Sequence, residues 1–334
     1  MTAPGTGPAP APGPEPLHLL GGIDEAGLGP LLGPLVVAGL LLEGPGGANA
    51  WTLCEPWFCK QPRDRRDRRI RVDDSKKVKV GARGHAQLER TALSLTLAAE
   101  GALPADVGAL LGPDLAGELM AYPWYEGLAA RPLPRWNDRR TLELEAHLAR
   151  QGMERSGVRC LLHPFHCLPV GRFNEAVARH DNKSLVLFEA SLAPLVRIVE
   201  AAARRAGDDA WSLRVVIDRQ GARGRYRSLL ARAFPGTDVA VVQERPGHSE
   251  YAVGGHTHLS FVEKGEDRSF PTAAASCLAK YVRELLIEAL NEWFRGRRPD
   301  LRPTAGYYSD GRRFLDDLGD DLVGLPRQLL VRCR

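Results

Sequence analysis

Short apolar segments of the chain predict β-strands, because they are rich in Val, Ile and Leu and are bounded by Gly, Pro or charged residues. The predicted strands cover residues 17–24, 34–42, 158–168 and 213–218, and either 238–243 or 258–263. Longer segments carry apolar residues at the i, i+3 and i+4 spacing of amphipathic helices. These predicted helices cover residues 85–103, 140–153, 185–207, 223–234 and 272–294. Two strands joined by a short turn, followed by strands that alternate with helices, predict an α/β fold with helices packed against a mixed sheet.

The composition of the 334-residue chain is typical of a globular protein, with 44% hydrophobic and 26% charged residues. Residues 1–16 are almost entirely Pro, Gly and Ala, so we expect a disordered tail followed by a single domain over 17–334. The net charge of +4 excludes a polycation, although basic residues cluster at 61–71 and 294–302. Neither a signal peptide nor an apolar run of about 18 residues is visible, so we expect a cytoplasmic protein without a membrane partner.

The cysteines predict reduced thiols, since the six of them show no CxxC spacing in a long chain. One segment, CLLHPFHC, places Cys160, His163, His166 and Cys167 within eight residues, which is compatible with a zinc site. Its interleaved Leu and Phe residues fit a strand whose side chains alternate between two faces, and we favour this interpretation.

Two adjacent acids, Asp24 and Glu25, follow an apolar run in the segment GGIDEAGLGPLLGP. Buried acids need a cation, a hydrogen-bond network or a catalytic task. A dinucleotide-binding loop is excluded because Leu32 occupies the third glycine position and a β-rich run follows Pro34, so we expect the turn to lead into an antiparallel strand. Neighbours in a strand point to opposite faces, so the two carboxylates can converge only if the strand ends or kinks there.

Two further signals are each open to a plainer interpretation. Asp218 ends an apolar strand, where functional groups gather in α/β sheets, but it could equally cap the next helix. Ser276, Lys280 and Glu284 recur every four residues on one face of the helix predicted at 272–294, as they would on any amphipathic surface helix.

Taken in order, these segments resemble a known family. The motifs IDEAGxGPLxGP, DSKK, IDxxG, FPxAAASxLAKxxRE and GYxSD lie at residues 23–34, 74–77, 217–221, 270–284 and 306–310. The chain thereby resembles the type 2 ribonucleases H, ribonuclease HII and its archaeal and eukaryotic relatives. The resemblance implies a ribonuclease H-like fold, with a five-stranded mixed sheet flanked by helices and a C-terminal helical extension.

The resemblance also implies a catalytic site of four metal-binding carboxylates: Asp24, Glu25, Asp218 and Glu284, the last standing where most members have Asp. Carboxylates suit two Mg²⁺ or Mn²⁺ ions about 4 Å apart, one activating water and the other stabilising the departing 3′ oxygen. The expected activity is endonucleolytic hydrolysis of the RNA strand of RNA–DNA hybrids, including single ribonucleotides in duplex DNA. The expected products carry a 3′-hydroxyl and a 5′-phosphate.

The expected partner is an RNA–DNA hybrid or a ribonucleotide-containing DNA duplex, bound by a monomer. In the family, peptide groups of a Gly-Arg-Gly turn recognise the ribose 2′-hydroxyl, and here the turn is Gly27-Leu28-Gly29. Tyr307 matches a tyrosine that stacks at the RNA–DNA junction. The remaining substrate-binding residues implied by the resemblance are Ser75, Lys76, Lys77, Ser276 and Lys280, of which the lysines are expected to contact phosphates.

Three segments, near 44–72, 112–138 and 244–258, resemble insertions into the compact bacterial pattern. The insertions, Leu28 and Glu284 keep open a catalytically impaired hybrid-binding protein of the same fold. Against it, a pure binder would gain from losing acids that repel phosphate. A nuclease of the same fold acting on DNA junctions is a third possibility, which activity on an all-DNA duplex would support.

Overall fold

The computed structural model describes residues 16–64, 66–319 and 324–333. The tail expected to be disordered, residues 1–16, lies outside the described residues except for Pro16. Among the described residues, no helix is long and apolar enough to cross a membrane.

One large mixed sheet forms the centre of the molecule, in the order β5-β2-β1-β7-β10-β9-β8, with β6 also pairing with β2. The strands are β1 (Leu17–Ala26), β2 (Leu35–Glu43), β5 (Arg159–Leu162), β6 (Phe165–Leu168), β7 (Trp211–Asp218), β8 (Val239–Arg245), β9 (His248–Val253) and β10 (Thr257–Val262). β1 is antiparallel to β2 and parallel to β7, and β10 is parallel to β7. Two short strands, β3 (Phe58–Cys59) and β4 (Ile70–Arg71), form a separate parallel pair.

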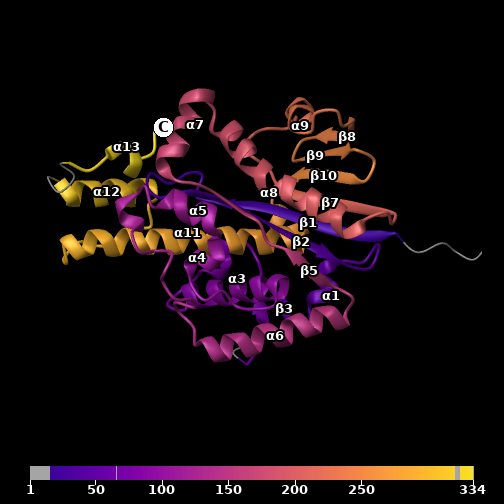
Figure 1. Cartoon of the computed structure of the whole chain (residues 1–334), viewed down its shortest axis with the longest axis horizontal. Helices are drawn as coiled ribbons and strands as arrows, with labels where there is room; N and C mark the ends of the chain where they lie inside the picture. Colours follow the sequence, from indigo (N-terminus) through magenta and orange to yellow (C-terminus); the bar gives the residue numbers. More distant parts are fainter. Residues whose placement is uncertain (1–15, 65, 320–323, 334) are drawn as a thin grey trace, which may run out of the picture.

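Helices cover both faces of this sheet (Figure 1). They are α1 (Ala50–Cys54), α2 (Ser75–Val78), α3 (Gly84–Glu100), α4 (Val107–Leu111), α5 (Pro113–Leu119), η1 (Pro123–Tyr125), α6 (Arg139–Arg155), α7 (Val170–His180), α8 (Lys183–Ala206), α9 (Arg227–Ala233), α10 (Gly265–Arg268), α11 (Phe270–Arg297), α12 (Tyr308–Leu318) and α13 (Arg327–Leu330). The predicted α/β class is confirmed, and the C-terminal helical extension corresponds to α12 and α13.

The sheet is larger than the five strands expected. Both candidates for the fifth strand exist: β10 occupies the position parallel to β7, while β8 lies at the sheet edge and pairs with β9. The predicted strand 158–168 is divided into β5 and β6, which pair with different parts of β2. The turn after β1 reverses the chain into antiparallel β2, as the sequence predicts.

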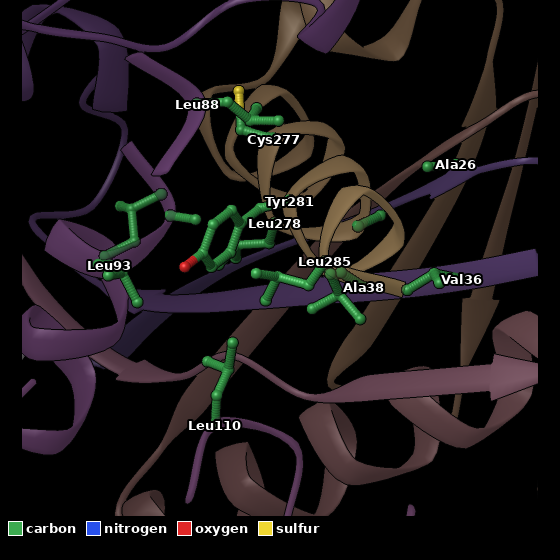
Figure 2. Close-up of a cluster of buried hydrophobic side chains, with 14 of the residues drawn as sticks. Ala26, Val36, Ala38, Leu88, Leu93, Leu110, Cys277, Leu278, Tyr281 and Leu285 are labelled. Atoms are coloured by element: carbon green, nitrogen blue, oxygen red, sulfur yellow. The ribbon is translucent and has the colours of Figure 1, made fainter. Parts of the chain in front are cut away.

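The two faces of the sheet bury separate hydrophobic clusters. One contains Ala38 of β2 with Leu93 of α3 and Leu278 of α11. Figure 2 shows side chains of α11 packed against both β2 and α3, with Tyr281 towards Leu93 and Leu285 beside Ala38. The other packs β1, β2 and β7 against α7 and α8, and includes Ile23 and Ile198. Residues of β1 therefore alternate between the α8 face and the α11 face.

The N-terminal end of α11 lies directly against β1. A Cβ atom placed on Gly22 would come within 2.1 Å of the backbone nitrogen of Thr272, so only glycine allows this approach. Thr272 also donates from Oγ1 to the carbonyl of Val216 in β7, at 2.9 Å. Gly22 therefore allows the N-terminal end of α11 to pack against β1 two residues before Asp24.

Candidate active site

Three carboxylates meet where β1 and β7 end. Asp24 and Glu25 come from β1 and Asp218 is the last residue of β7; one ligand oxygen from each lies within 4.8 Å of the others. In the part of the chain that the structure describes, this is the one such group of His, Cys, Asp or Glu that could hold a metal ion.

The geometry of the strand ends explains how neighbouring residues converge. The ladder between β1 and β7 ends at the pair Ile23 and Ile217, while β1 continues to pair with β2 through Ala26. Asp24 and Glu25 therefore extend past the last contact with β7. The Asp24 Oδ1 atom accepts a hydrogen bond of 2.7 Å from the Glu25 N–H, which turns the first carboxylate towards the second.

Burial and mutual repulsion dominate the electrostatics of this carboxylate cluster, Asp24, Glu25 and Asp218. Burial, then the charges of Glu25 and Asp218, raise the pKa of Asp24 well above its ordinary value. Burial and the charge of Asp218 raise the pKa of Glu25 to about 7, and burial also raises the pKa of Asp218. Such a cluster of hard oxygen donors that repel one another fits one or more divalent cations.

The DSKK segment reaches the carboxylate cluster through serine contacts. Ser276 Oγ on α11 lies 3.2 Å from Ser75 Oγ and accepts a hydrogen bond of 3.4 Å from the Ser75 N–H, and hydrogen bonding by Ser276 lowers the pKa of Asp24. Lys76 is exposed, and its charge lowers the pKa of both Glu25 and Asp218. Lys77, which the resemblance assigns to phosphate binding, forms ion pairs with Asp73 at 3.2 Å and with Asp267 at 3.4 Å. Both acids partly neutralise its charge.

Glu284, predicted to be the fourth metal-binding carboxylate, lies among cations and is not one of the three acids of the carboxylate cluster. Its Oε1 lies 2.8 Å from Lys280 Nζ, and its Oε2 lies 2.7 Å from Lys79 Nζ and 3.2 Å from His85. Burial alone would raise the pKa of Glu284, but His85 and the two lysines outweigh burial and hold it far below its ordinary value. Glu284 is therefore an ionised partner of nearby cations, and the buried Lys280 uses its charge in the ion pair with Glu284.

Another acid, Glu266, lies close in sequence to a contact of Asp218, although it is not a member of the carboxylate cluster. It follows β10 at the start of α10, one residue after Gly265, whose N–H donates to Asp218 Oδ1 at 2.9 Å. Burial, followed by repulsion from Asp218 and Asp74, raises the pKa of Glu266. The signal in the sequence was an acid four residues after the run LSFV, and it can be interpreted only once that run is known to lie beside β7.

Two buried arginines bind carbonyl groups of the glycine turn, residues 27–29, and of the segment that follows it. Arg332 donates to the carbonyls of Gly27 and Leu28, and to that of Gly33 at 2.8 Å. Arg283 on α11 donates to the carbonyls of Leu32 and Ala305. The C=O and N–H of a trans peptide point to opposite sides, so the N–H groups of Leu28 and Gly29 point away from Arg332.

The shape of the turn also requires glycine. Gly27 has φ of +95°, and a Cβ atom there would lie 2.5 Å from Arg283 Nε and 2.6 Å from the carbonyl oxygen of Pro34. Leu28 is half-buried against the hydrophobic cluster of the α8 face, which accounts for an apolar side chain at this position.

Tyr307 lies next to the same turn. The carbonyl of Gly306 accepts hydrogen bonds from Leu31 and Leu32, at 2.8 and 3.1 Å. The Tyr307 side chain is 44% exposed, and its ring centroid is 5.6 Å from Lys280 Nζ and 5.5 Å from Arg283 Cζ. An exposed ring backed by two cations is available for stacking.

The Cys/His segment lies apart from this site and is built of strands. β5 and β6 pair with β2, and His163 Nε2 lies 2.8 Å from Glu100 Oε1. Among the described residues no metal-binding group includes Cys160, His163, His166 or Cys167, in agreement with the strand interpretation.

Comparisons with known proteins give matches at the level of structure. No family model and no curated protein matches the chain. Ribonuclease HII of Archaeoglobus fulgidus, solved as a complex with PCNA, is 16% identical, with a TM-score of 0.43 over 95% of this chain and 94% of that one. The ribonuclease H2 from Pyrococcus horikoshii OT3 is 13% identical, with a TM-score of 0.40 over 93% and 92% of the two chains. Bst-RNase HIII in complex with Mn²⁺ is 16% identical, with a TM-score of 0.38 over 95% and 66%.

The solved structures that the chain resembles are thus ribonucleases H of types HII, H2 and HIII. At this identity, and with TM-scores below 0.5, the likeness by itself assigns neither family nor activity.

Proposed function

We propose that the protein is a divergent type 2 ribonuclease H, a metal-dependent endonuclease that hydrolyses the RNA strand of RNA–DNA hybrids and cuts at single ribonucleotides in duplex DNA. The observation that carries the proposal is the convergence of Asp24, Glu25 and Asp218 at the strand ends. Asp24 and Glu25 belong to the same sequence motif as the glycine turn. The ordered motifs at residues 23–34, 74–77, 270–284 and 306–310 support the same activity.

Hydrolysis of a phosphodiester, which is already anionic, builds further negative charge on the attacking and leaving oxygens, and this charge must be offset. When bound, two Mg²⁺ or Mn²⁺ ions would supply Lewis acidity to the attacking water and to the departing 3′ oxygen. Asp24, Glu25 and Asp218 would hold the ions, and Glu266 is the fourth carboxylate that we assign to the site in place of Glu284. Hydrolysis in this manner leaves a 3′-hydroxyl and a 5′-phosphate.

The residues around the carboxylate cluster would position the substrate. The outward N–H groups of Leu28 and Gly29 are available for the ribose 2′-hydroxyl, the group that distinguishes RNA from DNA. Tyr307 would stack on the sugar or base at the junction, and Lys76 would contact a phosphate next to the cleaved bond. Because this recognition uses backbone groups of the turn, it does not depend on an arginine side chain at position 28.

A cleavage assay with three end-labelled duplexes tests the proposal. The duplexes carry one ribonucleotide, a long RNA tract or only DNA, and each is incubated with Mg²⁺ or Mn²⁺. We expect cleavage of the first two, loss of that cleavage in Asp24→Asn, and none of the all-DNA duplex. Metal-independent binding without cleavage would instead support a hybrid-binding protein, and cutting of the all-DNA duplex would support a DNA nuclease.

A further inference from the structure

A basic pocket lies beside the carboxylate cluster and has no role in the mechanism described so far. It has a volume of about 470 Å³ and lies between the turn joining β8 to β9 and the loop after β10. Arg245 and His248 line it from the turn, and Lys264 and Arg268 line it from the loop and from α10.

The cations of this pocket lack acidic partners. Among the described residues, no ion pair or side-chain hydrogen bond engages Arg245, Lys264 or Arg268, all of which are exposed. The one acid in the lining, Glu263, lies 3.5 Å from Arg219 Nη1. Burial and the charges of Arg245 and Arg268 lower the pKa of His248, while the charge of Glu250 raises it. The first group outweighs Glu250. The field inside the pocket is therefore positive.

The pocket is joined directly to the carboxylate cluster. Val262 of β10 is paired with Asp218, and the next residue, Glu263, donates its N–H to the carbonyl of Gly247 at 3.0 Å, which fixes the β8–β9 turn to the loop. Lys264 lines the pocket while the following residue, Gly265, donates to Asp218. An anion in the pocket would therefore lie one strand away from the carboxylate cluster.

We propose that this pocket binds a backbone phosphate of the nucleic-acid duplex close to the phosphate that is cleaved. The inference rests on the proposed function, because it takes the occupant to be part of the same substrate. Arg245 and His248 belong to segment 244–258, which resembles an insertion, whereas Lys264 and Arg268 follow β10 outside that segment. The phosphate contact contributes to affinity without reading sequence, since phosphates carry no base information.

The test compares the salt dependence of duplex binding in two charge-matched variants. Arg245→Gln with Arg268→Gln removes two pocket cations. Arg155→Gln with Arg159→Gln removes two exposed arginines that form no ion pair with the residues the structure describes. Arg159 is paired with Glu43 of β2, next to the contact of Gly44 with His18 near the opposite end of β1. Binding of a labelled duplex carrying one ribonucleotide is measured by fluorescence anisotropy in EDTA, from 50 to 300 mM salt. Cleavage at saturating protein and unfolding midpoints are measured in parallel.

We expect the pocket variant to bind on the order of 3- to 10-fold more weakly at moderate salt, with the slope of log affinity against log salt reduced by about 1. The control variant should keep the slope of the wild type, and both variants should keep its unfolding midpoint. An unchanged slope in the pocket variant, with normal binding and cleavage by the wild type, would overturn the proposal that the pocket binds phosphate and would leave the proposed function intact. A wild type that neither binds nor cuts any duplex would overturn the proposed function, and this inference with it.

Discussion

Replacing Asp24 by asparagine should inactivate the enzyme and at the same time stabilise the metal-free protein. Asp24 is buried, and the charges of Glu25 and Asp218 act on it, so its pKa is well above the ordinary 3.8. In the unfolded chain the same carboxyl loses its proton near its ordinary pKa. Folding at neutral pH therefore either takes up a proton on Asp24 or buries its charge beside two other carboxylates, and both cost free energy.

The sign and size of the effect follow from this difference. Because the folded state binds the proton more tightly, stability falls as the pH rises from 3.8 towards the raised folded pKa. Each pH unit in this range costs about 1.4 kcal/mol, which sets an upper limit of about 4 kcal/mol at pH 7. Asparagine carries no charge and keeps an oxygen for the Glu25 N–H, so we expect the variant to be about 1–4 kcal/mol more stable at pH 7 and little changed near pH 4.

Urea unfolding in EDTA at several pH values measures this difference, and repeating it with Mg²⁺ or Mn²⁺ supplies a second readout. A ligand at 100 times its Kd stabilises a folded protein by about 2.7 kcal/mol, so the wild type should recover stability with metal while the variant should respond weakly. The matched control is Asp208→Asn, an exposed acid in the loop after α8, which should change neither curve.

The reasoning would be refuted by an Asp24→Asn variant that is no more stable than the wild type at pH 7 in EDTA. That result would mean that cations such as Lys76 already offset the charge of the carboxylate cluster.

Three further predictions concern neighbouring residues. Glu266→Gln should weaken stabilisation by Mn²⁺ and slow cleavage without changing the fold. Glu284→Gln should leave the Mn²⁺ titration unchanged. Equal losses of Mn²⁺ stabilisation in the two variants would contradict the assignment of Glu266 as the fourth acid. Arg332→Met should lower the free energy of unfolding by about 3 kcal/mol, because the carbonyls of Gly27 and Gly33 lose a charged donor. Urea titration measures this loss, which should be smaller in Arg332→Lys. Leu28→Arg should cost about 1 kcal/mol of stability through lost burial but bind duplexes more tightly at low salt, and anisotropy showing no gain would argue that the turn lies away from phosphate.

The sequence predicted the elements that carry the carboxylate cluster because their patterns are local. An apolar run that ends in an acid describes both β1 and β7, and the helical periodicity of 272–294 marks α11 within a few residues. The convergence of Asp24 and Glu25 also depended on a local event, the end of the ladder with β7.

Pairing across the sheet could not be predicted in the same way. Residues 239–245 and 257–262 have similar apolar patterns, and only the ladder shows that the second one lies beside β7. That ambiguity hid Glu266, since its relation to Asp218 depends on which strand is the neighbour of β7. The surroundings of Glu284 could not be predicted for a related reason: the helical spacing defines the face of α11 on which it lies, but not that Lys79 lies against it.

The close contact between Gly22 and Thr272 also determines how the site should respond to heat. α11 runs from this contact through Ser276 and Arg283, so one continuous buried helix supports both the acids and the glycine turn. Buried helices of this kind exchange their amide hydrogens mainly when the whole protein unfolds. Loss of activity on heating should consequently coincide with global melting, and the amides of α11 should be among the slowest in the molecule to exchange with deuterium.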